Sequence, residues 1–187
     1  IGLGVRDGML EVTSCALTGY TQTMTPTNTK KWTIVEYERM ADLGLFRPGE
    51  RVELFEGDIL EMSPQNVPHG HSLTHANHLL VQLFGDTHYV RVQLPLNVGE
   101  RTQLEPDFAL VQHRLIDEVA SHPWSADLVI EVSESSLAYD RGAKLRAYAQ
   151  AGIPEYWVVN LPDGLLEVYR DPDAEVGYRF RQVLKPE

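Results

Sequence analysis

The stretch DLVIEVSESSLAYDRGAKLRAYAQAGIPEYWVV, residues 127–159, decides the fold of this chain. Its two ends are apolar runs that predict buried strands. Between them a helix is expected over about 140–151, with Asp140 as its N-cap and with Gly152 and Pro154 ending it. A strand, a helix and a second strand in this order are typical of a sheet that has helices packed on it.

Periodicity outside this stretch predicts further helices and strands around the same sheet. Thr33 and Glu36 form a capping-box pattern that begins a first helix, expected over about 34–43. Apolar spacing predicts a second helix over about 71–84. Extended segments are expected as a hairpin of 51–55 and 58–62 around the turn Glu56-Gly57, and as strands at 90–98, 107–111 and 166–170. The predicted fold class is therefore α/β, or α+β, with a central mixed sheet flanked by helices.

The size and composition of the chain indicate one globular domain. Its 187 residues, 43% of them hydrophobic, suffice for a single core, which we expect over 31–187. Residues 1–30 show no sustained period and are expected to form an N-terminal extension that is flexible in part. No apolar run is long enough for a membrane span, and the pattern of a signal peptide is missing, so a soluble cytoplasmic protein is expected. The single cysteine, Cys15, cannot form an internal disulfide.

The net charge of −11 argues against a broad nucleic-acid-binding surface. Such a charge repels a phosphate backbone unless positive charge is concentrated locally or a metal ion intervenes. Arg141, Lys144 and Arg146 form the one compact basic cluster in the sequence. If DNA approaches this acidic protein, we expect it to approach there.

Two carboxylates lie on apolar strands, where ordinary packing does not place them. Asp107 opens the run DFALV, and Glu131 interrupts DLVIEV. A buried carboxylate costs several kcal/mol unless it is paired, hydrogen-bonded or bound to a metal, so the two together suggest a divalent-cation site. Taken alone, the Pro106-Asp107 pair is also typical of a turn or a cap. Because side chains alternate along a strand, Glu131 and Ser133 should point to the same face.

A lysine on the following helix is a candidate partner for these carboxylates. Asp140, Lys144 and Tyr148 follow i, i+4, i+8 spacing and should share one helix face. Many metal nucleases carry Glu-x-Lys on the strand, where this chain has Ser133, so Lys144 is the available replacement. The alternative is a solvated Asp–Lys pair that contributes a few tenths of a kcal/mol.

Histidines on the second predicted helix offer a competing site. His71, His75 and His78 follow i, i+4, i+7 spacing and could converge on Zn²⁺, although no fourth ligand accompanies them at a diagnostic spacing. The alternative interpretation of these histidines is that they form a polar helix face near a cleft, where His69 or His71 contacts phosphate.

The strings VELFEGDILEMSP, HGHSLTHANHLLVQL, LEPDFALV, the segment from Glu131 to Trp157, and LEVYR resemble the Uma-two family of predicted restriction endonucleases, within the PD-(D/E)XK superfamily. The resemblance covers most of residues 32–170. It implies a restriction-endonuclease-like core and a Mg²⁺-dependent endonuclease that hydrolyses phosphodiester bonds of nucleic acid, with DNA as the expected substrate. It also implies a homodimer.

By the same resemblance, four positions of this chain match the catalytic positions of the family: Glu53, Asp107, Glu131 and Lys144. Asp107, Glu131 and the carbonyl of Val132 would hold Mg²⁺ or Mn²⁺, and Glu53 would bind a second ion or orient water. His69, Asp140, Arg141 and Tyr148 are expected as supporting or substrate-contacting residues. The alternative function is a catalytically inactive nuclease-fold protein that acts as a binding or interaction module, which Ser133 and the net charge favour.

Overall fold

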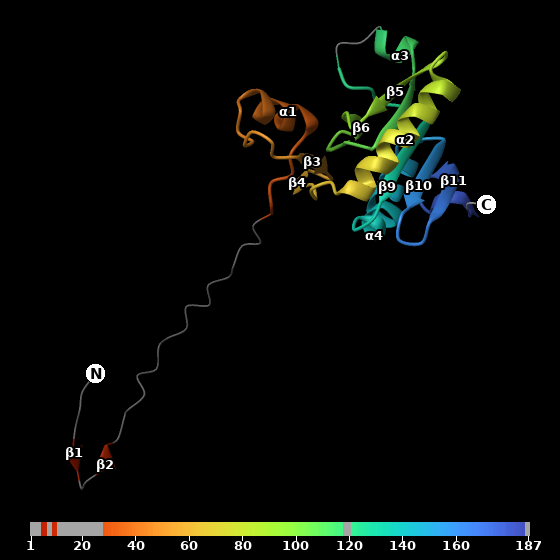
Figure 1. Ribbon diagram of the computed structural model, residues 1–187. Helices are drawn as coiled ribbons and strands as arrows, with labels where there is room; N and C mark the ends of the chain where they lie inside the picture. Colours follow the sequence, from red (N-terminus) through yellow and green to blue (C-terminus); the bar gives the residue numbers. More distant parts are fainter. Residues whose placement is uncertain (1–4, 7–8, 11–27, 118–120, 186–187) are drawn as a thin grey trace.

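The computed structural model describes residues 5–6, 9–10, 28–117 and 121–185 (Figure 1). The extension expected over 1–30 therefore lies almost entirely outside the described residues. Two short strands within it, β1 (Val5–Arg6) and β2 (Met9–Leu10), pair antiparallel. No helix in the described ranges is both long and apolar enough to cross a membrane.

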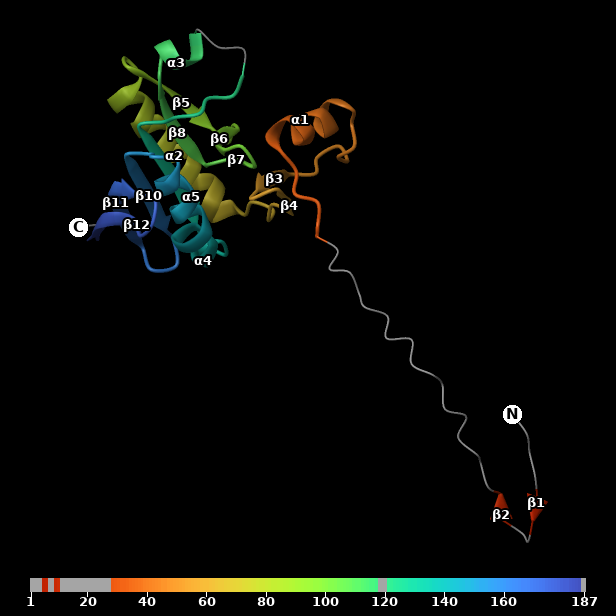
Figure 2. The ribbon, with the colours of Figure 1, turned by 180° about the vertical axis from the view of Figure 1, so that it is seen from behind.

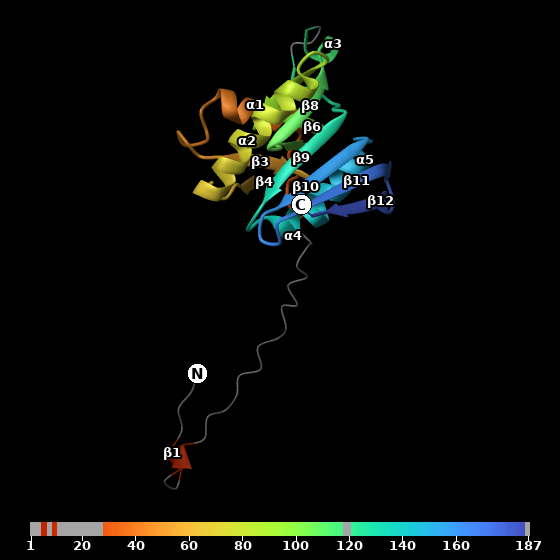
Figure 3. The same ribbon diagram turned by 45° about the vertical axis from the view of Figure 1, so that its right-hand side comes forward.

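A six-stranded mixed sheet forms the centre of the fold, as predicted. Figure 3 shows β9, β10, β11 and β12 side by side. The parallel pair is β9 with β10, and the other neighbours are antiparallel. In spatial order the strands are β12 (Gly177–Leu184), β11 (Leu165–Asp173), β10 (Glu155–Asn160), β9 (Leu128–Ser133), β8 (Phe108–Gln112) and β5 (His88–Val92).

A smaller antiparallel sheet lies beside the central one together with the first helix, α1 (Ile34–Asp42) (Figure 1). Its order is β4 (Asp58–Glu61), β3 (Val52–Phe55), β7 (Thr102–Leu104) and β6 (Leu96–Gly99). The single strand expected over 90–98 was wrong, because β5 and β6 belong to different sheets. The chain turns between them at Gln93, whose φ is +51°, and Pro95 follows, which cannot donate to a sheet ladder.

Helices cover both faces of the central sheet. The long helix α2 (Val67–Phe84) crosses one face (Figure 1), and a helical segment after β9 covers the other (Figure 2). Helix α2 begins four residues before the expected start, since Asn66 caps it and Pro68 is tolerated in a first turn. A short helix, α3 (Arg114–Asp117), follows β8.

The segment after β9 is a helix with a π-helical turn inside it. It consists of α4 (Leu137–Tyr139), the π-turn η1 (Asp140–Lys144) and α5 (Leu145–Gln150). The expectation that Asp140 is the N-cap was wrong, because helical structure begins three residues earlier, after Ser136. The Asp140 carboxylate instead accepts hydrogen bonds from the hydroxyls of Ser133, at 2.7 Å, and Ser136, at 2.6 Å.

Strand β9 divides its side chains between two cores. Leu128, Ile130 and Val132 pack with α2, whereas Val129 packs with α5 on the opposite face. Burying an aliphatic side chain of this size contributes about 1.5–3 kcal/mol, so both faces of the strand stabilise the fold. The α5 face also carries Glu131 and Ser133, which confirms that these two side chains point the same way.

The hairpin turn of β3 and β4 requires a glycine, and this gives a stability prediction. Gly57 has φ +82°, and a Cβ at this position would lie 2.7 Å from the Cβ of Lys31. We expect Gly57→Ala to lower the free energy of unfolding by about 2 kcal/mol, from the left-handed backbone and the contact together. Gly44, with φ +69° and no neighbour within 4 Å, provides the control. Urea unfolding should show a smaller loss for Gly44→Ala; equal losses would exclude the contact as a cause.

Candidate active site

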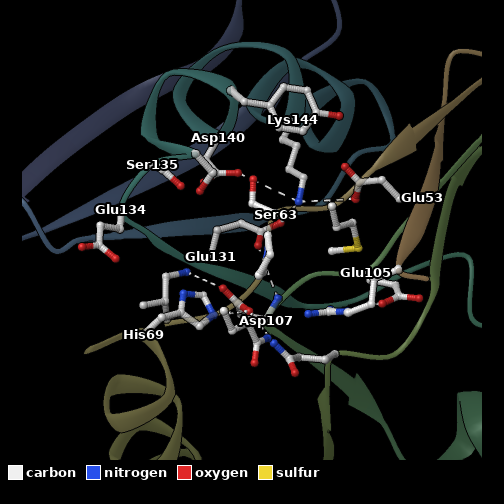
Figure 4. Close-up of a pocket in the computed structure, with 18 of the residues that line it drawn as sticks. Glu53, Ser63, His69, Glu105, Asp107, Glu131, Glu134, Ser135, Asp140 and Lys144 are labelled. Carbon is white, nitrogen blue, oxygen red and sulfur yellow. Dashed lines mark hydrogen bonds and ion pairs between the residues drawn. The ribbon is translucent and has the colours of Figure 1, made fainter. Parts of the chain in front are cut away.

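A cavity of about 410 Å³ lies between the two sheets and the π-turn (Figure 4). Strands β3 and β4, the connection from β4 to α2, the end of β9 and the following helical segment contribute its walls. All four predicted catalytic residues line it: Glu53, Asp107, Glu131 and Lys144. The fold thus brings together side chains that are up to 91 positions apart in the sequence.

Asp107 lies just before β8 and is held by donors from three segments. Its Oδ2 accepts the backbone N–H of Val132 at 2.8 Å, and its Oδ1 accepts Gln93 Nε2 at 3.0 Å. His69 Nε2 lies 3.2 Å from the same Oδ1. Burial alone would raise the pKa of Asp107, but these hydrogen bonds outweigh it and hold the pKa below its usual value. Asp107 is therefore a charged, fixed carboxylate.

Glu131 joins Asp107 to the helical segment. Its Oε2 accepts the backbone N–H of Asp107 at 3.3 Å, and its Oε1 accepts Lys144 Nζ at 3.0 Å and the Tyr148 hydroxyl at 2.8 Å. Burial raises the pKa of Glu131 to about 8, against the opposing attraction of Lys144. Two neighbouring carboxyls whose pKa values are shifted in opposite directions are typical of catalytic sites.

Lys144 is buried among three carboxylates. Its Nζ lies 3.0 Å from Glu131, 3.5 Å from Glu53 and 3.9 Å from Asp140. Burial alone would lower the pKa of Lys144, but these three carboxylates outweigh it and raise the pKa. Lys144 therefore stays an ammonium ion near neutral pH and can act as a fixed positive charge, not as a general base. The predicted shared face of Asp140, Lys144 and Tyr148 is confirmed.

Two buried oxygens in this cavity have no hydrogen-bond partner among the described residues: Glu53 Oε2 and the Tyr139 hydroxyl. Both residues line the cavity. Burial raises the pKa of Tyr139, and the Glu53 carboxylate adds to this effect. Glu53 Oε2 is the oxygen that lies 3.5 Å from Lys144 Nζ, so it is ion-paired but accepts no hydrogen bond. Buried polar atoms are rarely left unsatisfied, so these two oxygens can form hydrogen bonds with a ligand or with water.

The other predicted residues divide between the cavity and its surroundings. His69 and Asp140 line the cavity, as does Val132, whereas Tyr148 supports it from behind through Glu131. Arg141 lies outside the lining residues and pairs with Glu167 instead. The basic cluster of the sequence is therefore not one surface, since Lys144 is buried, Arg141 is paired, and only Arg146 is exposed.

Sequence reasoning missed four residues of the site. Gln93 donates a hydrogen bond to Asp107 from a left-handed backbone conformation, which no sequence pattern predicts. Backbone strain of this kind is often found at functional sites. Tyr139 reads as an ordinary helical residue. Arg51 and Glu105, which form an ion pair at 3.3 Å on the cavity wall, are 54 positions apart.

The donor set of the cavity suits a hard cation with few protein ligands. Among the described residues, no three His, Cys, Asp or Glu side chains are placed to hold one ion, and His71, His75 and His78 are exposed on α2. Asp107 and Glu131 nevertheless supply adjacent carboxylates. Mg²⁺ commonly binds through one or two carboxylates and keeps several waters, so this pair fits Mg²⁺ better than a closed zinc site.

Glu167 on β11 anchors the helical segment from outside the cavity. Its side chain is fully buried and accepts hydrogen bonds from Arg141 at 2.9 Å, Arg181 at 3.0 Å and Tyr169 at 2.7 Å. Asn160 donates to it as well, at 3.2 Å. Burial alone would raise the pKa of Glu167, but these donors lower it from 4.5 to about 2. The contact fixes the π-turn to the sheet through Arg141.

A stability prediction follows from this carboxylate. Because the folded-state pKa of Glu167 is depressed, its contribution is present above about pH 4.5 and is lost as the pH falls toward 2. At pH 7, we expect Glu167→Gln to lower the free energy of unfolding by about 2 kcal/mol, since both guanidinium groups are partly exposed and screened. The loss should shrink between pH 5 and pH 3 in urea titrations, while Glu175→Gln, on an exposed turn, should change little. A loss independent of pH would contradict this account.

The fold is of the restriction-endonuclease-like class. A solved structure described as a "putative nuclease belonging to DUF820" from Anabaena variabilis ATCC 29413 is similar to this chain, with a TM-score of 0.65 and 15% sequence identity. The similarity covers 83% of this chain and 85% of that one and shows the common fold. None of the curated proteins matches.

The sequence model of the Uma2 family, described as "Putative restriction endonuclease", matches residues 34–187. The chain belongs to the Uma2 family. The match extends through β11 and β12 to the end of the chain, and it includes the four residues that meet in the cavity. The family predicted from the sequence is confirmed.

Proposed function

We propose that this protein is a metal-dependent nuclease that hydrolyses phosphodiester bonds of nucleic acid, with DNA as the substrate. The observation that carries the proposal is the convergence of Asp107, Glu131 and Lys144, with Lys144 Nζ 3.0 Å from Glu131 Oε1. Asp107 directly precedes β8, Glu131 lies on β9, and Lys144 ends the π-turn. Family membership supports the same reaction class. A purely structural role gives no reason to bury this many charges together.

Asp107 and Glu131 would hold Mg²⁺ or Mn²⁺, together with the carbonyl of Val132. The N–H of Val132 already donates to Asp107, and the N–H and C=O of one strand residue point to the same side, which supports this assignment. Glu53 offers a buried oxygen without a hydrogen-bond partner for a second ion or for water. When bound, the ion would supply Lewis-acid polarisation of the phosphoryl group.

The protein's own residues would orient the reactants and stabilise charge. Lys144 presents a compact positive charge where negative charge develops on the phosphate, and Glu53 can accept a hydrogen bond from the attacking water. Tyr148 fixes Glu131, and His69 and Gln93 fix Asp107. Such positioning of reacting groups by packed side chains can supply a large part of a rate enhancement.

The first test is the metal dependence of cleavage by the intact protein. Labelled DNA and RNA should be cleaved with Mg²⁺ or Mn²⁺ and left intact with EDTA, and Glu131→Gln should abolish the activity. Glu175→Gln, a matched change at an exposed carboxylate, should keep it. If cleavage persists in the Glu131→Gln protein, it does not come from this site. The homodimer stays a prediction that analytical ultracentrifugation can test.

A further inference from the structure

The reactive groups of the proposed nuclease are recessed. Glu53 and Glu131 are 4% exposed, Lys144 5% and Asp107 7%. The cavity that gives access to them is about 410 Å³, a size that suits a ligand no larger than a nucleotide or two. A phosphate on the side of a duplex is flanked by its own strand and the complementary one, so it cannot enter such a space alone. A flexible single strand can bend one phosphate inward.

The charge of the cavity wall also disfavours a duplex. Seven carboxylates line it: Glu53, Glu61, Glu105, Asp107, Glu131, Glu134 and Asp140. Within the part of the chain that the structure describes, each side chain on this wall that can carry a positive charge already has a carboxylate partner: Arg51 has Glu105, His69 has Asp107, and Lys144 has Glu131. A protein that binds duplex DNA through its backbone can neutralise about 6–10 phosphates with Lys and Arg side chains. On this wall, no described side chain of this kind is left without a carboxylate partner.

Beside the apolar Leu60, Met62 and Pro64, part of the wall is neutral and able to hydrogen-bond. Gln65 and Asn66 come from the connection between β4 and α2, and Ser135 and Ser136 follow β9. The Asn66 side chain donates to Glu134, so these two connections are joined at the edge of the cavity. Amides and hydroxyls of this kind bind the edges of unpaired bases, which in a duplex are occupied by the other strand.

From size, charge and lining together, we infer that the cavity takes a single, unpaired strand, at an end, an overhang or a gap, and does not take the side of a duplex. The inference rests on the proposed nuclease function and specifies its substrate. Few phosphates contact the protein in this arrangement, and the bound cation contributes the main attraction for the one that is cleaved.

The test compares three DNA substrates of the same sequence with Mn²⁺: a single strand, a blunt duplex, and a duplex with a long unpaired overhang. We expect kcat/KM for the single strand to exceed that for the blunt duplex at least about tenfold, because duplex must first unpair, and cleavage of the third substrate should be confined to its overhang. Equal rates on single strand and blunt duplex would overturn the inference and leave the nuclease function standing. Failure to cleave any DNA or RNA would overturn both.

Two further measurements make this test specific to the cavity. Glu131→Gln should lose cleavage of all three substrates while Glu175→Gln keeps it, which excludes a contaminating nuclease. For the single strand, log kcat/KM should fall with log salt concentration with a slope of about −0.7 to −1.4, the value for one or two phosphates. A slope steeper than about −4 would show an extended basic contact surface and would contradict the inference.

Discussion

We expect the Asp107→Asn protein to bind Mn²⁺ at least about 100-fold more weakly than the unaltered protein and to lose nearly all metal-dependent cleavage, on the order of a thousandfold. The substitution keeps the size of the side chain but removes a charge that a hard cation requires. It also turns an amide group toward positions from which Val132, Gln93 and His69 now donate, so the site loses order as well as charge. Calorimetric Mn²⁺ titration and steady-state cleavage measure the two effects.

Asp127 provides a control for this change with the same kinds of hydrogen-bond partner, at a side chain that is 44% exposed where that of Asp107 is 10% exposed. It lies just before β9 and, like Asp107, accepts a histidine and a glutamine, His88 at 3.0 Å and Gln112 at 2.7 Å, but it does not line the cavity. Asp127→Asn should therefore leave Mn²⁺ affinity and cleavage unchanged. If both variants were equally impaired, the effect of Asp107→Asn would reflect folding. Unchanged Mn²⁺ affinity in Asp107→Asn would favour the reading of the protein as an inactive interaction module.

The Lys144→Met protein should differ from the Asp107→Asn protein, because we expect it to lose cleavage activity without losing Mn²⁺ affinity. We expect cleavage to fall about 10²- to 10³-fold, the cost of losing a positioned charge at the developing anion. Mn²⁺ affinity should stay the same or increase, since Lys144 Nζ occupies Glu131 Oε1, an oxygen that a cation needs. Single-turnover cleavage and calorimetry on the same preparation give both values.

Arg146→Met is the control for Lys144→Met. It removes the same charge from the same helical segment, at an exposed position outside the cavity lining. Thermal melts of both variants would show whether leaving Glu53, Glu131 and Asp140 without Lys144 unfolds the protein. Full cleavage activity in a folded Lys144→Met protein would remove Lys144 from the mechanism.

The sequence alone predicted those parts of the site that depend on local spacing. Alternation along β9 placed Glu131 and Ser133 on one face, and helical spacing placed Asp140, Lys144 and Tyr148 together. These predictions succeeded because neighbours in a strand or helix fix one another's direction. The capping box of Thr33 and Glu36 succeeded for the same reason.

Parts of the site that depend on distant contacts could not be predicted in this way. The extended run 90–98 is divided at Gln93 because its first half pairs in the central sheet and its second half in the smaller sheet. The pairing of Arg141 with Glu167 depends on β11, because Glu167 lies 26 positions further along the chain. Asp140 was mistaken for a cap because aspartate favours helix starts, whereas its preference is overridden by the hydroxyls of Ser133 and Ser136. Strand β12 lies beyond the last extended segment that was expected.

The π-turn at Asp140–Lys144 determines which side chains of the helical segment face the cavity. Successive residues of an α-helix advance by about 100° around its axis. A π-turn contains one extra residue, and the residues on its two sides keep the orientation that they would have in an uninterrupted α-helix. Deleting one residue of the turn, such as Gly142, would let the helix become regular and would leave the residues on its two sides in their present orientation. Deleting one residue early in α5, where no extra residue is accommodated, would instead rotate Asp140 and Lys144 by about 100° relative to Tyr148. The helical segment should therefore tolerate the loss of one residue within the π-turn better than the loss of one residue in α5.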